Sequence, residues 1–272
     1  MSIPTIPVLR KGVEYASYDH VELKSVRTGD VIARVAQANA ALIKRDLRRL
    51  DRSCLAGFSI TDLVAMTNEA GRHFMESTLP VGDQLQTPED YIHQLSETSG
   101  LPHSLVRRNM AKLHQVFTEI ETILAGLSRG LSLNVLDKLH GQQNGIPVAY
   151  FPTANFLAVV LPSNSPGVNS LWMPSIALKT PLVLKPSREE PWTPFRIIQS
   201  FIAAGVPANG SYQQANAQIS VSTGGNEDLD PETSKNFSLG LNLNSRGLVG
   251  GNPAIDLDAR TAFAELTYDL NA

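Results

Sequence analysis

The clearest pattern in the chain is a pair of continuous apolar runs, each followed by a loop and then by a helical pattern. The first run covers residues 156–161 and the second covers residues 182–184. Such runs are typical of strands that are covered on both faces, as in a parallel sheet. We therefore expect strands at 155–161 and 182–184, and helices at 168–178 and 192–204. This βαβα order predicts the α/β class, with a partial doubly wound (Rossmann-like) parallel sheet.

The residues before this unit have mostly helical periodicity. The spacing of apolar residues predicts helices over 31–50, 61–76 and 104–127, and Asp30 is placed to cap the first. Thr87-Pro88-Glu89-Asp90 has the form of a capping box that opens a further helix, and Gly100-Leu101-Pro102 is expected to end that helix. Residues 1–30 are interpreted as an extended arm and residues 146–150 as a strand.

The composition changes near residue 208. Residues 1–208 contain 20 Lys and Arg against 18 Asp and Glu, whereas residues 209–272 contain three basic and eight acidic residues. Apolar and polar residues alternate in three segments of this tail, which predicts short antiparallel strands. We interpret the chain as a helical N-terminal part of the nucleotide-binding domain (1–145), a βαβα cofactor-binding core (146–208) and a β-rich tail (209–272).

Charge and cysteine content narrow the choice of function. The net charge of -3 gives no reason to expect nucleic acid as a partner. Cys54 is the single cysteine, so no internal disulfide or cysteine-based metal cluster can form, and the six histidines are not at ligand spacing. No run approaches the roughly 18 apolar residues of a spanning helix, and no signal-peptide pattern is visible. These features predict a cytoplasmic protein with no membrane partner and no metal site.

Several spaced motifs in the central unit resemble the cofactor-binding half of the aldehyde dehydrogenase superfamily. The strand at 155–161 leads into a Pro-x-Asn-x-Pro loop formed by Pro162, Asn164 and Pro166. The second strand ends in Lys185-Pro186-Ser187, and Ala204-Gly205-Val206-Pro207 closes the unit. The order and spacing of these elements agree with the family over about residues 1–208.

The resemblance implies roles for six residues. Asn164 would be the catalytic residue that donates its amide N–H to a developing oxyanion. Lys185 would contact the hydroxyls of the adenosine ribose, and the other expected cofactor-binding residues are Pro162, Ser163, Ser187 and Arg188. The implied cofactor is NAD or NADP, and the implied substrate is a small-molecule aldehyde or an acyl thioester. Without the resemblance, Asn164 would be interpreted as an Asx-turn residue and Lys185 as a solvated lysine.

Four residues depart from the family pattern. Ser163 replaces the usual Trp, and Lys179-Thr180 replaces the usual Gly-Asn, which looks closer to the acyl-CoA reductase branches. Arg188 replaces the glutamate that binds the ribose hydroxyls, and an arginine can pair with a 2′-phosphate. This substitution predicts that NADP is accepted at least as well as NAD.

The catalytic residues of the family do not follow Pro207. The glycine-rich turn, the glutamate that activates water and the nucleophilic cysteine are not found there, and Cys54 lies far upstream. Without that thiol no thioester can form. We therefore expect this chain to be an incomplete oxidoreductase that has no catalytic activity by itself. Whether the chain is an enzyme stays open. The alternative function is a non-catalytic nucleotide-binding or assembly module that adds strands to another chain. A homo-oligomer is also possible under either function.

The tail is similar to barrel segments of TonB-dependent outer-membrane receptors. The similar segments are residues 225–237 and 262–270, in the reverse of the order that the family shows. Three strands cannot close a barrel, and open sheet edges are not viable in lipid. These two facts argue against a membrane barrel. An outer-membrane receptor fragment is nevertheless kept as a third hypothesis, which only the tail supports. The other interpretation of these segments is a soluble hairpin at the edge of the domain.

Overall fold

The computed structural model describes residues 3–50, 52–163, 165–207 and 212–214. All of them lie in the unit that spans Met1–Glu227. The fold belongs to the α/β class with parallel strands at its centre, as the sequence predicts. No helix in these ranges is both long enough and apolar enough to cross a membrane.

The central element is a five-stranded sheet with the order β10-β11-β12-β2-β3. Its strands are β10 (Leu157–Val160), β11 (Leu182–Lys185), β12 (Tyr212–Gln214), β2 (Val8–Arg10) and β3 (Val13–Tyr15). Strands β10, β11 and β12 run parallel, and β2 and β3 extend the sheet in antiparallel fashion. The N-terminal arm is therefore part of the sheet, through a hairpin whose turn residues Lys11 and Gly12 both have positive φ.

Helices cover both faces of this sheet, which is why the fold is doubly wound. On one face the hydrophobic cluster includes Leu182 and Leu184 of β11 together with residues of α7 (Pro174–Ala177) and α8 (Trp192–Ala203). On the other face, Val183 packs near residues of α1 (Ala40–Leu47). Asp46 of α1 accepts two hydrogen bonds, of 2.6 and 2.8 Å, from the Arg10 guanidinium of β2, which ties this helix to the sheet.

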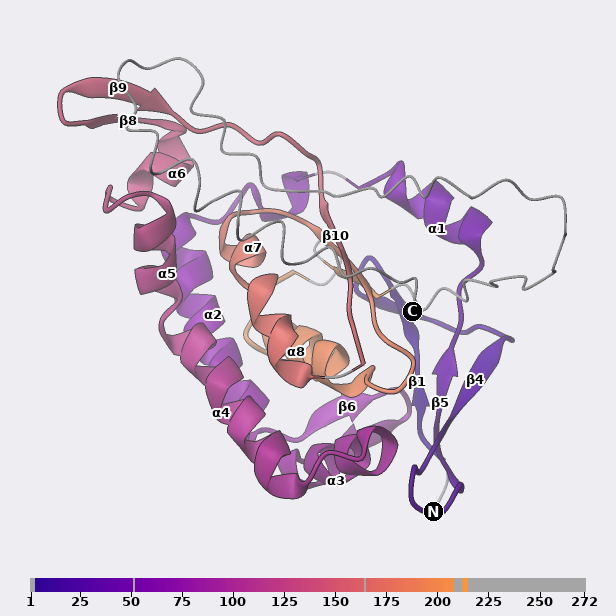
Figure 1. Ribbon diagram of the computed structural model, residues 1–272. Helices are drawn as coiled ribbons and strands as arrows, with labels where there is room; N and C mark the ends of the chain where they lie inside the picture. The colour runs from indigo at the N-terminus through magenta and orange to yellow at the C-terminus, as the bar shows by residue number, and fades with distance from the viewer. Residues whose placement is uncertain (1–2, 51, 164, 208–211, 215–272) are drawn as a thin grey trace, which may run out of the picture. The chain divides into compact units, whose positions relative to one another are not determined.

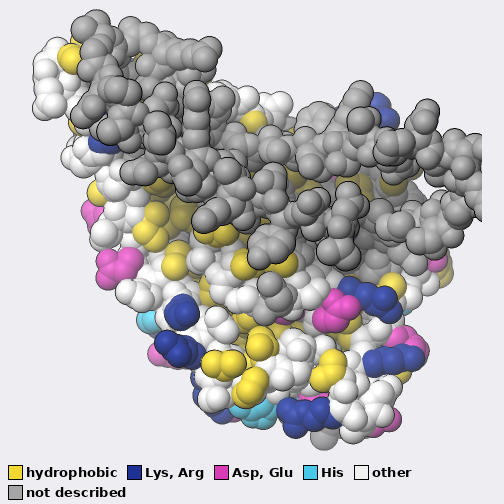
Figure 2. Space-filling view, in the orientation of Figure 1, with side chains coloured by type: hydrophobic (Ala, Val, Ile, Leu, Met, Phe, Trp, Pro, Cys, Tyr) yellow, Lys and Arg dark blue, Asp and Glu magenta, His cyan; other side chains and the backbone are white. Residues whose placement is uncertain are grey.

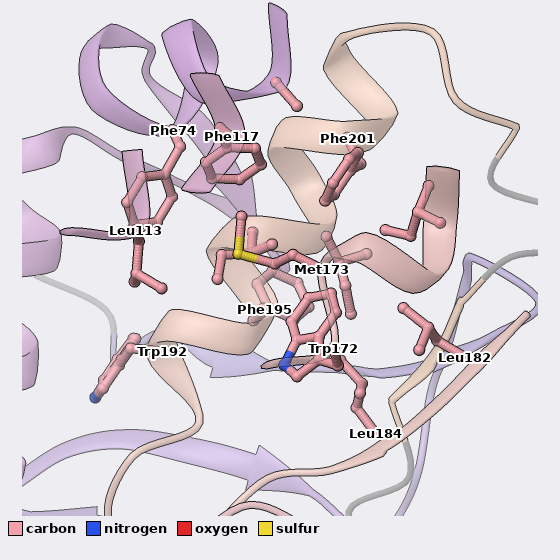
Figure 3. Packing of buried hydrophobic residues seen from close by; sticks show 14 of the residues in the cluster. Phe74, Leu113, Phe117, Trp172, Met173, Leu182, Leu184, Trp192, Phe195 and Phe201 are labelled. Carbon is pink, nitrogen blue, oxygen red and sulfur yellow. The ribbon is translucent and has the colours of Figure 1, made fainter. Parts of the chain in front are cut away.

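A layer of longer helices packs against α8 (Figure 1). The layer consists of α2 (Ile60–Glu76), α3 (Pro88–Ser99), α4 (His103–Thr118) and α5 (Ile120–Leu127). Phe74, Phe117 and Phe201 meet where α2, α4 and α8 come together, with Met173 beside them, as Figure 3 shows. This aromatic cluster joins the helical layer to the sheet in one core.

The remaining elements form small sheets and short helices around this core. They are β1 (Thr5–Ile6), β4 (His20–Lys24) and β5 (Val31–Ala36) in one sheet, the hairpins β6 (Leu79–Val81) with β7 (Gln84–Gln86) and β8 (His140–Gln143) with β9 (Ile146–Ala149), and the helices η1 (Ser53–Leu55), α6 (Asn134–Lys138) and η2 (Pro166–Leu171). Residues 1–145 thus contain strands as well as helices.

Several local predictions are confirmed. Helix α3 begins with the predicted capping box: the Thr87 N–H donates to the Asp90 carboxylate at 2.9 Å, and the Asp90 N–H donates to the Thr87 hydroxyl at 3.1 Å. It ends at Gly100, whose φ of 75° favours glycine. The helix over 61–76, the strand at 182–184 and the helix from Trp192 are also present.

The helix predicted over residues 31–50 is wrong in its first half. Val31–Ala36 forms strand β5, which pairs with β1 and β4, and the helix starts only after Asn39. Asn39 is also the cap, accepting a 2.8 Å bond from the Leu42 N–H, so the cap expected at Asp30 is wrong too. The segment is rich in β-branched residues, and pairing on both sides stabilises the extended conformation.

Two further helices differ from their predicted form. The helix expected over 104–127 is divided at Glu119, whose φ of −98° and ψ of 15° interrupt it between α4 and α5. The helix expected over 168–178 consists of the 3₁₀ helix η2 and the four-residue helix α7. Pro174 cannot continue a preceding α-helix because it has no N–H, but it is accepted at the start of a new one.

Strand β10 is not covered on both faces, contrary to the prediction from its apolar run. Leu157 and Val159 pack against the core, whereas Ala158 is exposed and Val160 is 71% exposed. Within the described residues β10 is the edge strand of the five-stranded sheet. Continuous hydrophobicity therefore does not distinguish this edge strand from the fully buried β11.

The alternating segments of the tail and both receptor-like segments lie outside the described residues, so those predictions stay untested. Residues 212–214, which the sequence assigns to the β-rich tail, form strand β12. They pair with Leu182, Val183 and Leu184 of β11 in parallel register.

Candidate functional site

The predicted site residues lie on two loops at one edge of the parallel sheet. Val160 of β10 is in register with Lys185 of β11, and the Leu161 N–H donates to the Lys185 carbonyl at 2.9 Å. The loops that follow these strands therefore start side by side. The first loop carries Pro162 and Ser163, and the second carries Ser187 and Arg188. Carboxyl ends of parallel strands are the usual location of ligand sites in α/β sheets.

On the first loop, Pro162 and Ser163 are exposed. Asn164, the predicted oxyanion donor, lies outside the described residues, so its role stays a prediction. The chain resumes at Ser165, whose hydroxyl accepts a 3.2 Å bond from the Gly167 N–H, and Pro166 then opens η2. The residues on both sides of Asn164 are thus described and partly constrained.

Asn169 holds the end of this loop in place. Its side-chain N–H donates to the Pro166 carbonyl at 2.9 Å, and its Oδ1 accepts from the indole N–H of Trp172 at 3.0 Å. Asn169 and Trp172 are both buried. No motif in the sequence marks Asn169, although a lone Asn within an apolar helical pattern is a usable signal, because a buried amide needs partners.

The second loop and the end of β11 present two cations, Lys185 and Arg188, that have no partner among the described residues. The Lys185 side chain, at the end of β11, is partly buried, and Arg188 is exposed. Neither side chain forms a hydrogen bond or ion pair with another described residue. Ser187 accepts a 3.1 Å bond from the Glu190 N–H, which leaves its hydroxyl hydrogen available. Lys185, Ser187 and Arg188 thus lie close together at the end of β11, and their part in binding a cofactor stays a prediction.

A hydrogen bond joins the two loops. The Ser163 hydroxyl donates to Oε2 of Glu189 at 2.6 Å. A short bond to a carboxylate is among the stronger kinds of hydrogen bond. Sequence reasoning missed Glu189, because the resemblance directs attention to position 188, where the family has its glutamate and this chain has Arg188.

Glu190, the next residue, is buried and belongs to the core instead of the site. Its Oε1 accepts a 2.8 Å bond from the Thr193 N–H and another bond from the Thr193 hydroxyl. That hydroxyl also lies 2.7 Å from the Tyr91 hydroxyl of α3. Burial raises the pKa of Glu190 to about 7, although the bonds from Thr193 oppose the shift. Glu190 therefore fixes the start of α8 directly after the second loop.

Cys54 lies at the other end of the strands. The neighbouring Arg52 donates to the carbonyls of Ala154 and Leu178 at 3.1 and 3.0 Å. These two residues precede β10 and β11, so they mark the amino ends of the strands. Cys54 itself is partly buried against the main hydrophobic cluster. A four-residue strand spans roughly 13 Å, which separates this thiol from Ser163 and Lys185.

Metal ligands and charge clusters do not mark another site in the described ranges. No group of three or more His, Cys, Asp or Glu side chains able to hold a metal ion is found there. Folding brings His93 and His103 together, with ring centroids 6.0 Å apart. On the described part of the face in Figure 2, basic and acidic side chains are interspersed with hydrophobic ones.

The donor set at the carboxyl edge fits the ribose end of a dinucleotide. Lys185, Ser187 and Arg188 offer an ammonium, a hydroxyl and a guanidinium, which match ribose hydroxyl and phosphate oxygens. Glu189 adds a carboxylate acceptor. The absence of intramolecular partners for Lys185 and Arg188 within the described chain leaves both available to a ligand.

Comparison with solved structures identifies the fold. No protein-family model matches the sequence, and no curated protein matches it either. An NADP-dependent enzyme of E. coli is similar with a TM-score of 0.61 and 14% identity, covering 80% of this chain and 43% of the other. An aldehyde dehydrogenase of Brucella melitensis biovar abortus has a TM-score of 0.61 and 15% identity, covering 79% and 42%.

A third structure, described as a methylmalonate-semialdehyde dehydrogenase of Sinorhizobium meliloti in complex with NAD, has a TM-score of 0.60 and 18% identity. The match covers 80% of this chain and 42% of that one. This chain thus spans about two fifths of the length of the structures it resembles. Over about four fifths of its own length, it has the fold found in aldehyde dehydrogenases.

Proposed function

We propose that this chain is the nucleotide-binding unit of an aldehyde dehydrogenase-like oxidoreductase that uses NAD or NADP. The observation that carries the proposal is the pairing of the Ser163 and Lys185 loops at the carboxyl ends of two in-register parallel strands. This is where doubly wound sheets bind nucleotides. The shared fold supports the proposal at the level of architecture.

Each residue has a defined part in binding. Lys185 donates to the ribose hydroxyls, and Ser187 offers a second donor on the same loop. Pro162 and Ser163 form the adjacent wall from the first loop. Arg188 is exposed at the rim, where its charge is accessible to phosphate. A bound nicotinamide cofactor supplies the hydride acceptor for oxidising an aldehyde, or the donor for reducing an acyl thioester.

Asn164 is proposed as the catalytic residue, since an amide N–H on the first loop can stabilise an oxyanion. This chemistry also requires a nucleophile, and the one thiol, Cys54, lies beside the amino ends of the strands. We therefore expect the chain to bind nucleotide without oxidising aldehydes or reducing acyl thioesters.

Calorimetric titration with NAD and NADP tests the binding proposal. We expect measurable binding of at least one nucleotide, and a loss of about tenfold in affinity in Lys185→Met, because a charged donor to the ligand contributes about 1.5 kcal/mol or more. Lys112→Met, which removes an exposed lysine on α4, is the matched control and should bind normally. Absence of binding at millimolar nucleotide would overturn the proposal.

Assays with short aldehydes and NAD(P) test the catalytic part. We expect no turnover above the rate without protein. Turnover that persists in Cys54→Ser would contradict the thioester chemistry of the family, and turnover that disappears in Cys54→Ser would contradict the placement of that thiol outside the site.

A second candidate function, strand addition to another chain, is favoured by the edge strand β10. Its outer edge has no strand partner within the described residues, and Val160 is exposed. Open edges of this kind can pair with another chain, including a second copy. Sedimentation of the wild type and of Val160→Lys would test pairing with a second copy, because a lysine on an edge strand opposes pairing; equal masses at the monomer value would exclude a pair of copies.

A further inference from the structure

Glu190 is a buried residue at the point where the second loop meets α8. It is 1% exposed, whereas Arg188, two residues earlier, is exposed. The Glu190 N–H donates to the Ser187 hydroxyl at 3.1 Å, and Oε1 of its carboxylate accepts a 2.8 Å bond from the Thr193 N–H in the first turn of the helix. This one residue therefore ties the loop to the start of α8.

Two hydroxyl groups extend this contact to α3. When Glu190 is ionised its carboxylate can only accept, so the Thr193 hydroxyl donates to Oε1. A hydroxyl has one hydrogen, so the Tyr91 hydroxyl, which lies 2.7 Å from that of Thr193, donates to it in turn. Tyr91 and Thr193 are both completely buried. The hydrogen bonds of both groups therefore depend on the position of the Glu190 carboxylate.

The negative charge of ionised Glu190 is not compensated by a cation. Oε2 has no hydrogen bond to another described residue, and neither oxygen forms an ion pair with a described Lys, Arg or His. The bonds from Thr193 and the positive amino end of α8 favour the anion. Taking an unpaired carboxylate out of water is nevertheless costly, whereas the protonated form is neutral. Burial outweighs the bonds and raises the pKa of Glu190 to about 7.

The buried ionisable groups beside Glu190 keep their charge state between pH 5 and 8. Burial raises the pKa of Tyr91, and burial lowers the pKa of Arg196 on α8 to about 10. The Arg196 guanidinium lies 5.6 Å from the centroid of the Tyr91 ring and donates to the backbone carbonyls of Phe74 and Ser77. The other charged groups near by, on α3 and on the second loop, reach solvent; they are Asp90, Arg188 and Glu189.

A short outward movement of the second loop brings the ionised carboxylate into water. Arg188 and Glu189, directly before it, already reach the surface. The movement breaks the bonds from the N–H and the hydroxyl of Thr193, which leaves the first turn of α8 without that acceptor. Strand β11 before the loop is held by its pairing with β10 and β12, which does not involve Glu190.

We propose that Glu190 is a pH-sensitive switch: the protonated side chain closes the second loop onto α8, and the ionised side chain opens the loop and the start of the helix. The switch needs no bound nucleotide, so this inference is independent of the proposed function. Because the pKa is raised from 4.5 to about 7 in the closed form, closure is complete below pH 4.5 and is lost as the pH rises through 7. The equilibrium constant for opening should increase by about tenfold or more between pH 5 and pH 8.

Hydrogen exchange measured by mass spectrometry at pH 5 and 8 tests the switch, with each rate divided by the intrinsic rate at the same pH. In the wild type, peptides covering residues 188–196 should lose protection at pH 8 by about tenfold or more, while peptides covering β11 keep theirs. Glu190→Gln has a neutral side chain of the same shape, so its residues 188–196 should stay protected at both pH values. Glu189→Gln, one position earlier, is the matched control and should keep the pH dependence of the wild type.

Thr193→Val is a second test that retains Glu190. It removes one donor to the carboxylate, so opening at pH 8 should exceed that of the wild type. Thermal unfolding of each variant shows whether the fold is retained. Equal protection of wild-type residues 188–196 at both pH values would overturn the inference, as would an equal loss in Glu190→Gln or no increase in Thr193→Val. Loss of protection in β11 to the same extent would show that the whole chain unfolds, which would also overturn a local switch.

Discussion

The ammonium of Lys179 lies 2.6 Å from Oδ1 of Asp137, and the backbone of Lys179 adopts a left-handed φ of 54°. Asp137 also accepts bonds of 3.2 and 3.0 Å from the Ile60 N–H at the start of α2. This ion pair joins the segment before β11 to α6 and α2. The ion pair holds Lys179 in a backbone conformation that favours glycine, and glycine is the residue usual at this position in the resembled family.

Substituting Lys179 separates the backbone strain from the ion pair. Lys179→Ala keeps the unfavourable φ and loses the ion pair, so we expect the free energy of unfolding to fall by up to about 1 kcal/mol. Lys179→Gly loses the same pair but relieves the strain, and should be about 1 kcal/mol more stable than Lys179→Ala. Urea denaturation measures both. Equal stability of the two variants would show that the left-handed conformation is not strained.

Helices α2 and α4 approach closely at Gly71. A Cβ atom added there would lie 2.7 Å from Cβ of Phe117, which cannot rotate away. Gly71→Ala should therefore lower the free energy of unfolding by about 1–3 kcal/mol. Gly126→Ala is the matched control on α5, because nothing lies within 4 Å of the added atom; it should be neutral or stabilising by up to ~1 kcal/mol. Equal effects in chemical denaturation would contradict this packing.

Arg196 is a buried guanidinium that serves backbone carbonyls. It is 1% exposed and donates to Phe74 and Ser77 at the end of α2 and to Gln86 of β7, at distances of 2.8–3.2 Å. Burial lowers its pKa to about 10. Because α2 ends against these bonds, Arg196 provides the partners for its last carbonyls.

Arg196→Met should be destabilising by roughly 3 kcal/mol or more, because it leaves several buried carbonyls without donors. Arg196→Lys keeps a charge but cannot match the planar donor geometry, so we expect a loss of similar size. Arg108→Met on α4, where the side chain is exposed, is the control. Retention of wild-type stability in Arg196→Met would show that water or other groups replace the guanidinium.

Glu190 should make stability depend on pH. Its pKa is raised from 4.5 to about 7 by burial, so the folded state binds the proton more tightly than the unfolded state. The contribution to stability is complete below pH 4.5 and is lost as the pH rises toward and through 7, by up to roughly 3 kcal/mol. Glu190→Gln should remove this part of the pH dependence. At pH 8 the free energy of unfolding of Glu190→Gln should therefore be higher than that of the wild type.

Denaturation of the wild type and Glu190→Gln at pH 5, 6, 7 and 8 measures this effect. Parallel curves for the two proteins would assign the pH dependence to other groups. Loss of stability in Glu190→Gln at every pH would instead show that the bonds to the Thr193 N–H and hydroxyl outweigh the cost of burying the charge.

Features that depend on neighbouring residues in the chain were predictable. The capping box at Thr87 and Asp90, the stop at Gly100 and the helix beginning near Thr61 are each specified within a few residues, because caps and positive φ are local interactions. The order of strands and loops that places Lys185 and Ser163 at one edge was likewise readable, since parallel strands in a βαβ unit share their carboxyl edge.

Pairing partners were not readable from the same patterns. Val31–Ala36 has apolar residues at helical spacing, yet β1 and β4 lie on both sides of it and stabilise a strand. The apolar run of β10 resembles that of β11, but one becomes an edge and the other a covered strand. In both cases the conformation follows from contacts with segments far away in the sequence, which propensity does not contain.

By itself, the sequence determined the fold class, the capping box at Thr87 with the helix stop at Gly100, and the motifs that predict a nucleotide site on two loops. Only the tertiary structure decided that Glu189 is held by Ser163, that Cys54 lies beside the opposite ends of the strands, and that Arg196 serves three backbone carbonyls. The physical reason is the range of the interactions. Caps and turns form between residues a few positions apart, whereas these contacts join side chains to groups 26 to 122 positions away.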